Sequence, residues 1–274
     1  MRKGWSKNNV RTRLVLSIAL LLTSFGFPAS AVPGWRIVAT TKSLASPSPP
    51  NSTPQIVTTV SQNRVKYETQ AWSQIVDLRT QRLAVINHIG QVYWEGSIDE
   101  YLSVAAKRGR EVRTQRDTLL QRLTPDQRMV IERSSGPFDV SATTLKVTVT
   151  PTPEEGTIAG YKAHKYTVLR NSEPYEETWI TGEVNLSAEV DMQRLRMFIQ
   201  QLQESRTTPP GAVLAELTDL VSKGYPVKTV NLLSHITKEV IRAERKDLAD
   251  EEFAAPKGYA QRTLTEVMSP PRLR

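Results

Sequence analysis

Residues 156–181 read GTIAGYKAHKYTVLRNSEPYEETWIT, and this stretch decides the fold. Two of its runs mix apolar and polar residues with a period near two, and the polar, proline-containing segment 171–174 separates them. Such a pattern predicts a β-strand, a turn and a second strand. Just upstream, TTLKVTVT at 143–150 places Leu145, Val147 and Val149 on one face. We therefore expect an antiparallel sheet with one buried face and one solvent-exposed face.

Further strand patterns lie on both sides of this stretch. Residues 34–41 could form a first strand, and residues 55–95 have the pattern of a meander, with short runs at 55–60, 63–68, 72–78, 82–89 and 91–94. The breaks between these runs are too short for a parallel crossover, so the neighbours should be antiparallel. Two more strands are expected at 224–233 and 236–248.

Helical patterns alternate with the strands. A helix is expected at 98–123, and a second at 124–133, where Thr124, Pro125 and Gln127 suit the N-cap, the first helical position and a capping box. Others are expected at 187–205 and 212–224. This order predicts an α+β fold with helices on one face of an antiparallel sheet. The basic helix could instead bind a nucleic acid or an anionic membrane; the simpler interpretation packs its Leu, Val and Met residues on the sheet.

The first 31 residues have the pattern of a secretory signal peptide. Residues 1–13 carry five basic and no acidic side chains, a short apolar run follows, and Ala29 and Ala31 occupy the two small-residue positions before the cleavage site. We expect cleavage after Ala31 and a periplasmic or secreted protein. A membrane anchor is the alternative, but the run of about 14 residues is shorter than the roughly 20 that a span needs. No span is expected after the leader is removed.

Composition narrows the remaining possibilities. Hydrophobic residues make up 39% of the 274 residues and charged residues 23%, which suits a folded core. We expect one domain over 32–268, a flexible Ser/Pro-rich segment at 42–54 that is either a linker or a surface loop, a disordered tail at 269–274, and a monomer. Without the leader, 31 basic residues face 28 acidic ones, so the net charge falls from +8 to +3. Nucleic-acid binding thereby loses its main support.

The sequence offers no catalytic motif. The absence of cysteine excludes disulfides, thiolate metal sites and a cysteine nucleophile. His88, His164 and His235 lie in separate strand-like runs without metal-ligand spacing, although distant strands could still converge. Adjacent carboxylates in a strand point to opposite faces and are badly placed to act as an acid–base pair. We expect no metal and no cofactor.

Aromatic residues are the more suggestive group, because many fall in the expected strands. Such residues commonly pack in a core or pair across strands. The functional alternative is that some line a cavity between the sheet and its helices. The candidate ligand-binding residues are Trp72, Tyr93, Trp94, Tyr166 and Trp179.

Four short motifs resemble a family of exported bacterial proteins known as domain of unknown function 4412. They are Ile158, Gly160, Tyr161, Tyr166 and Val168; Trp179 and Ile180; Gly224, Tyr225 and Pro226; and Phe253, Pro256, Gly258 and Tyr259. The resemblance is specific over 156–181 and 224–259 and loose over 55–95. Many relatives have a cysteine where this chain has Ala163, so any role of that thiol is absent here.

The resemblance implies a fold similar to the lipoprotein carriers LolA and LolB, in which a curved antiparallel sheet forms a half barrel and helices pack on its concave face. Such a sheet would form one wall of an apolar cleft. Three functions follow as hypotheses: a non-enzymatic envelope protein that binds a lipid, an acyl chain or a lipidated protein in the cleft; a protein-interaction or sensor module whose helices fill the cleft; and a cryptic hydrolase. Fold alone does not decide among them.

Overall fold

A computed structural model of the chain describes residues 31–43, 54–128, 147–205 and 223–269. Four of the predicted segments lie mostly outside the described residues: the signal peptide, the 42–54 segment, the helix at 212–224 and the 269–274 tail. So do the later part of the helix expected at 124–133 and the start of the strand expected at 143.

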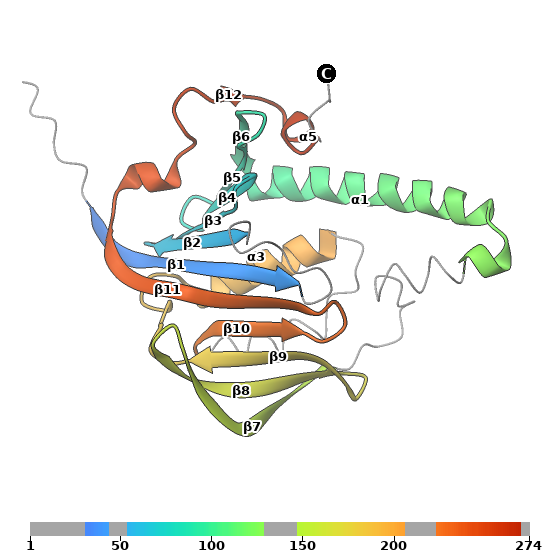
Figure 1. Cartoon of the computed structure of the whole chain (residues 1–274). Helices are drawn as coiled ribbons and strands as arrows, with labels where there is room; N and C mark the ends of the chain where they lie inside the picture. The colour runs from blue at the N-terminus through green and yellow to red at the C-terminus, as the bar shows by residue number, and fades with distance from the viewer. Residues whose placement is uncertain (1–30, 44–53, 129–146, 206–222, 270–274) are drawn as a thin grey trace, which may run out of the picture.

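Twelve strands within the described residues form one open, curved sheet (Figure 1). The order across the sheet is β12-β6-β5-β4-β3-β2-β1-β11-β10-β9-β8-β7, and every pair is antiparallel except β12 with β6. The bounds are β1 Val32–Ser43, β2 Gln55–Ser61, β3 Arg64–Glu68, β4 Trp72–Asp77, β5 Arg82–Asn87, β6 Val92–Ser97, β7 Val147–Ile158, β8 Tyr161–Arg170, β9 Glu173–Thr181, β10 Tyr225–Asn231, β11 Ile236–Leu248 and β12 Ala260–Gln261. The predicted meander and the predicted antiparallel sheet are confirmed.

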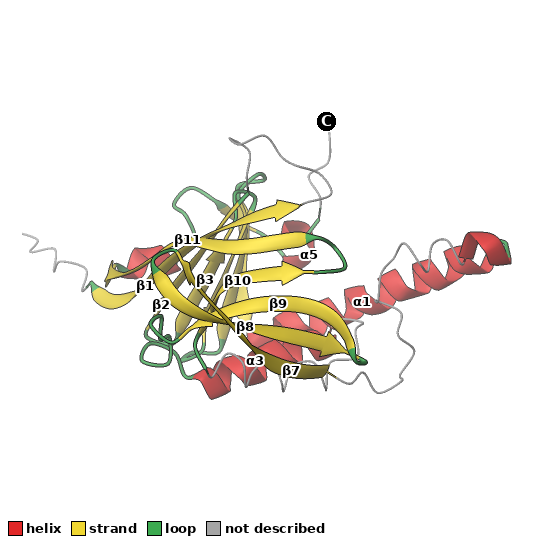
Figure 2. Cartoon of the chain, turned by 60° about the horizontal axis from the view of Figure 1, so that its bottom comes forward, coloured by secondary structure: helices red, strands yellow, loops and turns green. Residues whose placement is uncertain are grey.

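The first and the last long strands join the two halves of the sheet. β1 pairs with β11 from Val32 opposite Leu248 to Ser43 opposite Ile236, with a bulge between Val38 and Ala39. On its other side β1 pairs with β2, which begins the meander. Strands from the two ends of the chain therefore lie side by side in the middle of the sheet (Figure 2).

The stretch that decides the fold contains two turns and not one. The predicted turn lies at Asn171 and Ser172, whose φ angles of 51° and 71° match the type I′ turn that suits a two-residue hairpin. A second turn at Ala159 and Gly160, with φ of 51° and 87°, separates β7 from β8. Residues 156–158 therefore end β7 and do not begin β8.

β7 was only partly predicted, because prolines interrupt its pattern. It contains Pro151 and Pro153, and its pairing with β8 shifts register between Pro151 and Glu155. Proline donates no hydrogen bond to a neighbouring strand and is confined to sheet edges and bulges. β7 ends the strand order, which is where such a sequence can be accommodated.

The described helices begin at capping residues. α1 (Ile98–Gln121) starts after Ser97, whose hydroxyl accepts the N–H of Glu100 at 3.0 Å. The capping box predicted at Thr124 and Gln127 is present, with reciprocal contacts of 3.1 and 3.4 Å. No helix among these residues has the length and apolar character needed to cross a membrane.

α3 (Met192–Ser205) begins five residues later than predicted. The carboxylate of Asp191 accepts the N–H groups of Gln193 and Arg194 at 3.0 and 3.1 Å and so defines the start of the helix. The sequence before it, SAEV, forms turns and carries Val190 into the core at 2% exposure.

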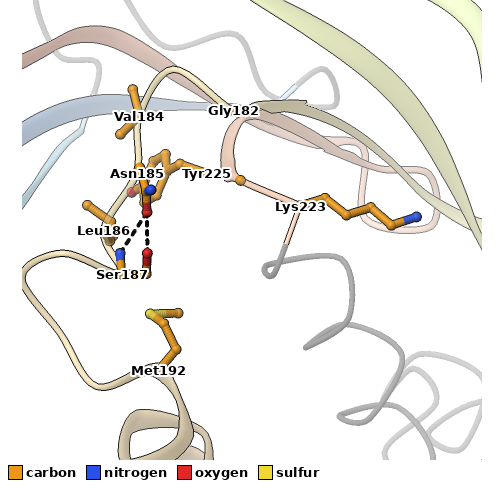
Figure 3. Close-up of a pocket in the computed structure, with 9 residues that line it drawn as sticks. Gly182, Val184, Asn185, Leu186, Ser187, Met192, Lys223 and Tyr225 are labelled. Atoms are coloured by element: carbon orange, nitrogen blue, oxygen red, sulfur yellow. Dashed lines mark hydrogen bonds between the residues drawn. The ribbon is translucent and has the colours of Figure 1, made fainter.

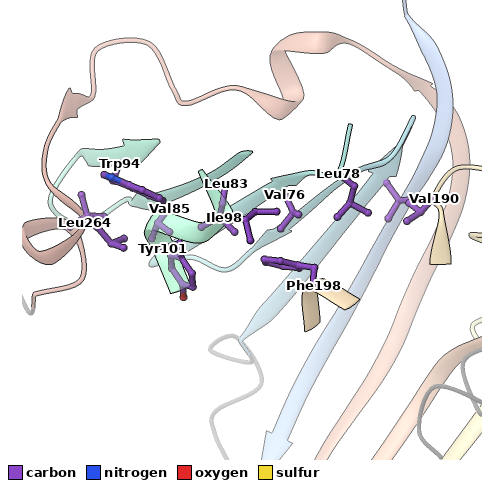
Figure 4. Close-up of a cluster of buried hydrophobic side chains, with 12 residues drawn as sticks. Val76, Leu78, Leu83, Val85, Trp94, Ile98, Tyr101, Val190, Phe198 and Leu264 are labelled. Carbon is purple, nitrogen blue, oxygen red and sulfur yellow. The ribbon is translucent and has the colours of Figure 1, made fainter. Parts of the chain in front are cut away.

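The largest core cluster covers one face of the meander, here called the inner face (Figure 4). Strand residues such as Val76, Leu83 and Val85 meet Tyr101 of α1 and Phe198 of α3 there. Burial of each such side chain contributes about 1.5–3 kcal/mol relative to exposure. The side chains of the chain's own helices thus fill this part of the inner face.

The segment 250–259, here called the C-terminal strap, covers the opposite, outer face. It begins with the 3-10 helix η3 (Asp250–Phe253), and Phe253 and Tyr259 pack against Ile75 and Ile86. The chain then adds β12 to the edge of β6 and returns to the inner face as α5 (Leu264–Val267), whose apolar residues join the largest cluster. The strap therefore wraps around the β6 edge of the sheet.

Candidate functional site

A cavity of about 320 Å³ lies where the end of β9, the start of α3 and the start of β10 meet (Figure 3). This volume is near the lower end of the ~300–1,000 Å³ range of small-molecule sites. The lining residues that the structure describes are Gly182, Val184, Asn185, Leu186, Ser187, Met192, Lys223, Gly224 and Tyr225. Most of the side chains among them are apolar, and this composition favours an apolar ligand.

A wider hollow of about 890 Å³ between β6, α1 and α5 has a different character. Its lining includes Glu95, Glu100, Arg262 and Glu266, and it is largely open to solvent. Charged, open hollows offer little apolar surface to bury, so the smaller cavity is the better candidate for a ligand.

The close approach of two strands shapes the smaller cavity. Gly224 has φ of +146°, and a Cβ atom at this position would lie 2.0 Å from the carbonyl oxygen of Thr181. Only glycine allows the start of β10 to run this close to the end of β9. The glycine of the Gly-Tyr-Pro motif is therefore a structural requirement of the cavity wall.

Burial and hydrogen bonds fix the conformation of the loop 182–187. Val184 is fully buried, and the indole N–H of Trp35 on β1 donates to the carbonyl oxygen of Asn185 at 3.1 Å. The side-chain oxygen of Asn185 accepts the N–H and the hydroxyl of Ser187 at 2.9 and 2.6 Å, as Figure 3 shows. Fixed hydrogen bonds of this kind keep the polar groups of the loop occupied and leave its apolar side chains to line the cavity.

Tyr225 is anchored across the sheet. Burial raises the pKa of its phenol, a hydrogen bond with Thr58 of β2 opposes the rise, and the nearby Tyr67 adds to it. Because the hydroxyl has a partner, the ring can serve as an apolar wall of the cavity without leaving a buried polar atom unpaired.

Of the predicted ligand-binding aromatics, Trp72, Trp94 and Tyr93 belong to the meander. Trp94 is 5% exposed and lies 6.2 Å from Tyr101 between ring centres, inside the largest cluster, and Trp72 packs against the same cluster. Tyr93 faces the other way and packs with Phe253 under the strap. The structure does not bring these three to the cavity.

The other two predicted residues lie in the second half of the sheet. Tyr166 packs against a small cluster with Val168, and the ammonium of Lys223 lies 4.9 Å above its ring. Trp179 lies between the ammonium groups of Lys165 and Lys228, at 5.1 and 5.3 Å from the ring centre. Tyr166 thus contacts Lys223, which lines the cavity. The ligand-binding role of all five aromatic residues stays a prediction.

Sequence reasoning missed most of the cavity-lining residues. Leu186 and Met192 lie in or next to turns, where no periodicity marks an apolar residue as inward-facing. Tyr225 was noted as part of a motif but not as a site residue. A signal was nevertheless present, because a Gly-Tyr-Pro sequence at the start of a strand indicates a close approach of backbones.

A serine and a histidine lie in contact on the outer face, the arrangement that a hydrolase would need. The hydroxyl of Ser73 is 2.6 Å from Nε2 of His88, and Nδ1 of His88 is 3.2 Å from the hydroxyl of Tyr259. Ser73 is fully buried, however, so its oxygen cannot reach a substrate. The group joins the strap to the sheet.

The other two histidines lie in separate surroundings. His164 lies 3.2 Å from Glu155, and His235, with φ of 53°, lies in the turn before β11 and not in a strand as predicted. Within the ranges that the structure describes, no three His, Asp or Glu side chains gather in a way that could hold a metal ion.

Comparisons with known proteins give one family and several distant structures. Residues 138–259 match the model of the family described as "Domain of unknown function (DUF4412)", and no curated protein matches the sequence. A structure of PNGF-II has 13% identity and a TM-score of 0.38, covering 86% of this chain and 32% of that one.

Two further structures contain MucB. The complex of MucA and MucB from Pseudomonas aeruginosa has 10% identity and a TM-score of 0.33, covering 83% of this chain and 57% of that one. A structure of MucB has 8% identity and a TM-score of 0.35, covering 84% and 59%. This chain thus spans less than two thirds of each of these chains, and with TM-scores below 0.5 they identify no function for it. The family match supports the resemblance over residues 138–259.

Proposed function

We propose that this chain is an exported, non-enzymatic binding protein that holds one acyl chain of an apolar ligand in the cavity between β9, α3 and β10. The observation that carries the proposal is the lining of that cavity by Val184, Leu186, Met192 and Tyr225. The signal-peptide pattern supports export, and the family resemblance supports a carrier-like fold. The proposed ligand is a lipid, a fatty acid or the lipid of a lipidated protein.

The size of the cavity suits one chain and not several. Each buried methylene contributes about 0.8 kcal/mol, so about ten of them would match the ~8 kcal/mol of a micromolar affinity. Loss of translational and conformational freedom raises the number that is needed. Affinity should therefore increase with chain length until the cavity is full.

The test is calorimetric titration of the delipidated mature protein, residues 32–274, with fatty acids of increasing length below their micelle concentrations. Met192→Trp should fill the cavity and weaken binding at least tenfold. Met197→Trp is the matched control, because Met197 lies on the same helix and is 54% exposed. Affinity that does not depend on chain length, or that survives Met192→Trp, would contradict the proposal.

A protein-interaction module is the second candidate, and two observations favour it. The helices α1, α3 and α5 fill the inner face of the meander with their own side chains. Leu233 and Ile236, at the turn between β10 and β11, are 59% and 41% exposed. A stable complex that forms with a protein of the envelope and is lost in Leu233→Ser, while fatty acids fail to bind, would support this function instead.

A further inference from the structure

We infer that the ligand of the cavity is an anionic amphiphile, whose single acyl chain lies against Leu186, Met192 and Tyr225 and whose headgroup pairs with Lys223. The inference rests on the proposed function and names its ligand class. Lys223 is the one charged residue among the described lining residues. Figure 3 shows its side chain extending from the rim, away from the apolar residues.

The position of Lys223 makes it available to a ligand. Its ammonium lies 4.9 Å above the ring of Tyr166, a contact that orients the amine but leaves its charge unneutralised. No carboxylate of the described residues forms an ion pair with it. A cation at the mouth of an apolar cavity attracts an anion and repels a second cation.

The carboxylates of the neighbouring loop are all engaged elsewhere. Glu183 accepts the backbone N–H of Lys162 at 2.9 Å, and Glu189 pairs with Arg245 at 2.8 Å. Asp191 caps α3 and pairs with Arg194 at 3.3 Å. The arginines offset the charges of Glu189 and Asp191, and the carboxylate of Glu183 is bonded to the backbone of β8, so none of these three carboxylates pairs with Lys223.

Cavity and cation together select one ligand class. The apolar lining selects a hydrocarbon chain, the volume of about 320 Å³ selects a single chain over the two of a phospholipid, and the lysine selects an anionic end. Free fatty acids and alkyl phosphates share this chemistry. An alcohol of the same length has the chain without the charge and is the natural comparison.

The experiment titrates the delipidated mature protein with dodecanoate, dodecyl phosphate and dodecanol at pH 8, where both acids are ionised. Wild type should bind the two anions about fivefold more tightly than the alcohol, the effect of one partly exposed ion pair. Lys223→Met should remove this preference and leave the affinity for dodecanol unchanged. Lys223→Arg should keep it.

Lys107→Met is the matched control, because Lys107 is an exposed lysine on α1, outside the cavity lining. It should leave the preference intact. Equal binding of anions and alcohol by wild type, or a preference that survives Lys223→Met, would overturn the inference while the proposed function stands. Failure of all three ligands to bind a folded wild-type protein would overturn the proposed function and the inference together. A difference between dodecanoate and dodecyl phosphate identifies which anion the rim prefers.

Discussion

Glu176 on β9 is a half-buried carboxyl whose pKa departs strongly from its usual value. Burial raises its pKa from 4.5 to about 7, and the charge of Arg170 opposes the rise. The folded state therefore holds a proton that the unfolded chain releases near pH 4.5. The stabilisation from this proton is complete below pH 4.5, falls as the pH rises, and is lost once the pH passes about 7.

We predict that Glu176→Gln makes the protein more resistant to unfolding at pH 8, by on the order of 2 kcal/mol, and changes little at pH 4. The amide cannot ionise, so the loss of stability between the two pH values should flatten. Urea unfolding followed by circular dichroism at several pH values measures this. Glu173→Gln, an exposed carboxyl on the same strand, should leave the pH dependence as it is. An unchanged slope in Glu176→Gln would show that this carboxyl is ionised in the folded protein.

The residues of the family motifs have structural roles where the structure shows their contacts. Gly160 occupies the left-handed position of the turn before β8, and the hydroxyl of Tyr161 donates to the carbonyl oxygen of Ala243 at 2.7 Å. Ala163 is 1% exposed in the cluster with Ile37. These motif residues define a fold, and they do not by themselves mark a catalytic site.

The C-terminal strap contacts several strands at once. Phe253 lies under the guanidinium of Arg64, 4.3 Å from ring centre to carbon, and packs on the cluster of Ile75 and Ile86. Arg64 also contacts Asp250 at 2.8 Å, and Glu252 pairs with Arg36 at 3.3 Å. The strap therefore connects to β1, β3, β4 and β5.

We predict that Phe253→Ala destabilises the protein by about 2 kcal/mol, because a half-buried ring is lost from the outer face. The loss of local stability should be greatest in the residues that directly follow the strap. Hydrogen exchange should speed up at the amides of Ala260 and Arg262, which donate to Gln91 and Tyr93 of the β6 edge. Lys257→Ala, an exposed position in the same strap, should change neither quantity. Unaltered exchange in Phe253→Ala would mean that β12 is held without the strap.

Strands and helices whose apolar residues recur with a clear period were predictable from the sequence. Features that depend on contacts between distant segments were not. Alternation located the strands of the meander within one to three residues, the change to a helical pattern after Ser97 located the start of α1, and the capping signals located the Thr124 capping box. β7 was missed in part, because its prolines are tolerated only at a sheet edge. The cavity was missed because the loop 182–187 and the start of β10 are distant in sequence and meet only after folding.

At the scale of the whole molecule, the sheet is continuous across the boundary of the family match. Residues 138–259 contain β7 to β11, yet β11 pairs along its length with β1, which lies outside the match. The cluster behind this pair combines Ile37 and Ala39 of β1 with Val227 and Val240. Without β1, the longest strand of the match would be an unpaired edge with an exposed apolar face, an arrangement that favours aggregation.

We therefore predict that residues 138–259, expressed alone, do not fold, whereas residues 32–274 unfold in one cooperative transition. Removing β1 takes away the β1–β11 hydrogen bonds and the apolar contacts of Ile37, which is 1% exposed, so the remaining strands cannot offset their loss of conformational entropy. Thermal unfolding followed by far-UV and near-UV circular dichroism tests both statements, and coincident transitions in the longer chain would indicate a single domain. A control fragment that carries residues 32–43 fused ahead of 138–259 should recover some structure, because it restores the missing strand. A sharp thermal transition in 138–259 alone would show that the matched segment is a domain in its own right, with β1 as an addition to its edge.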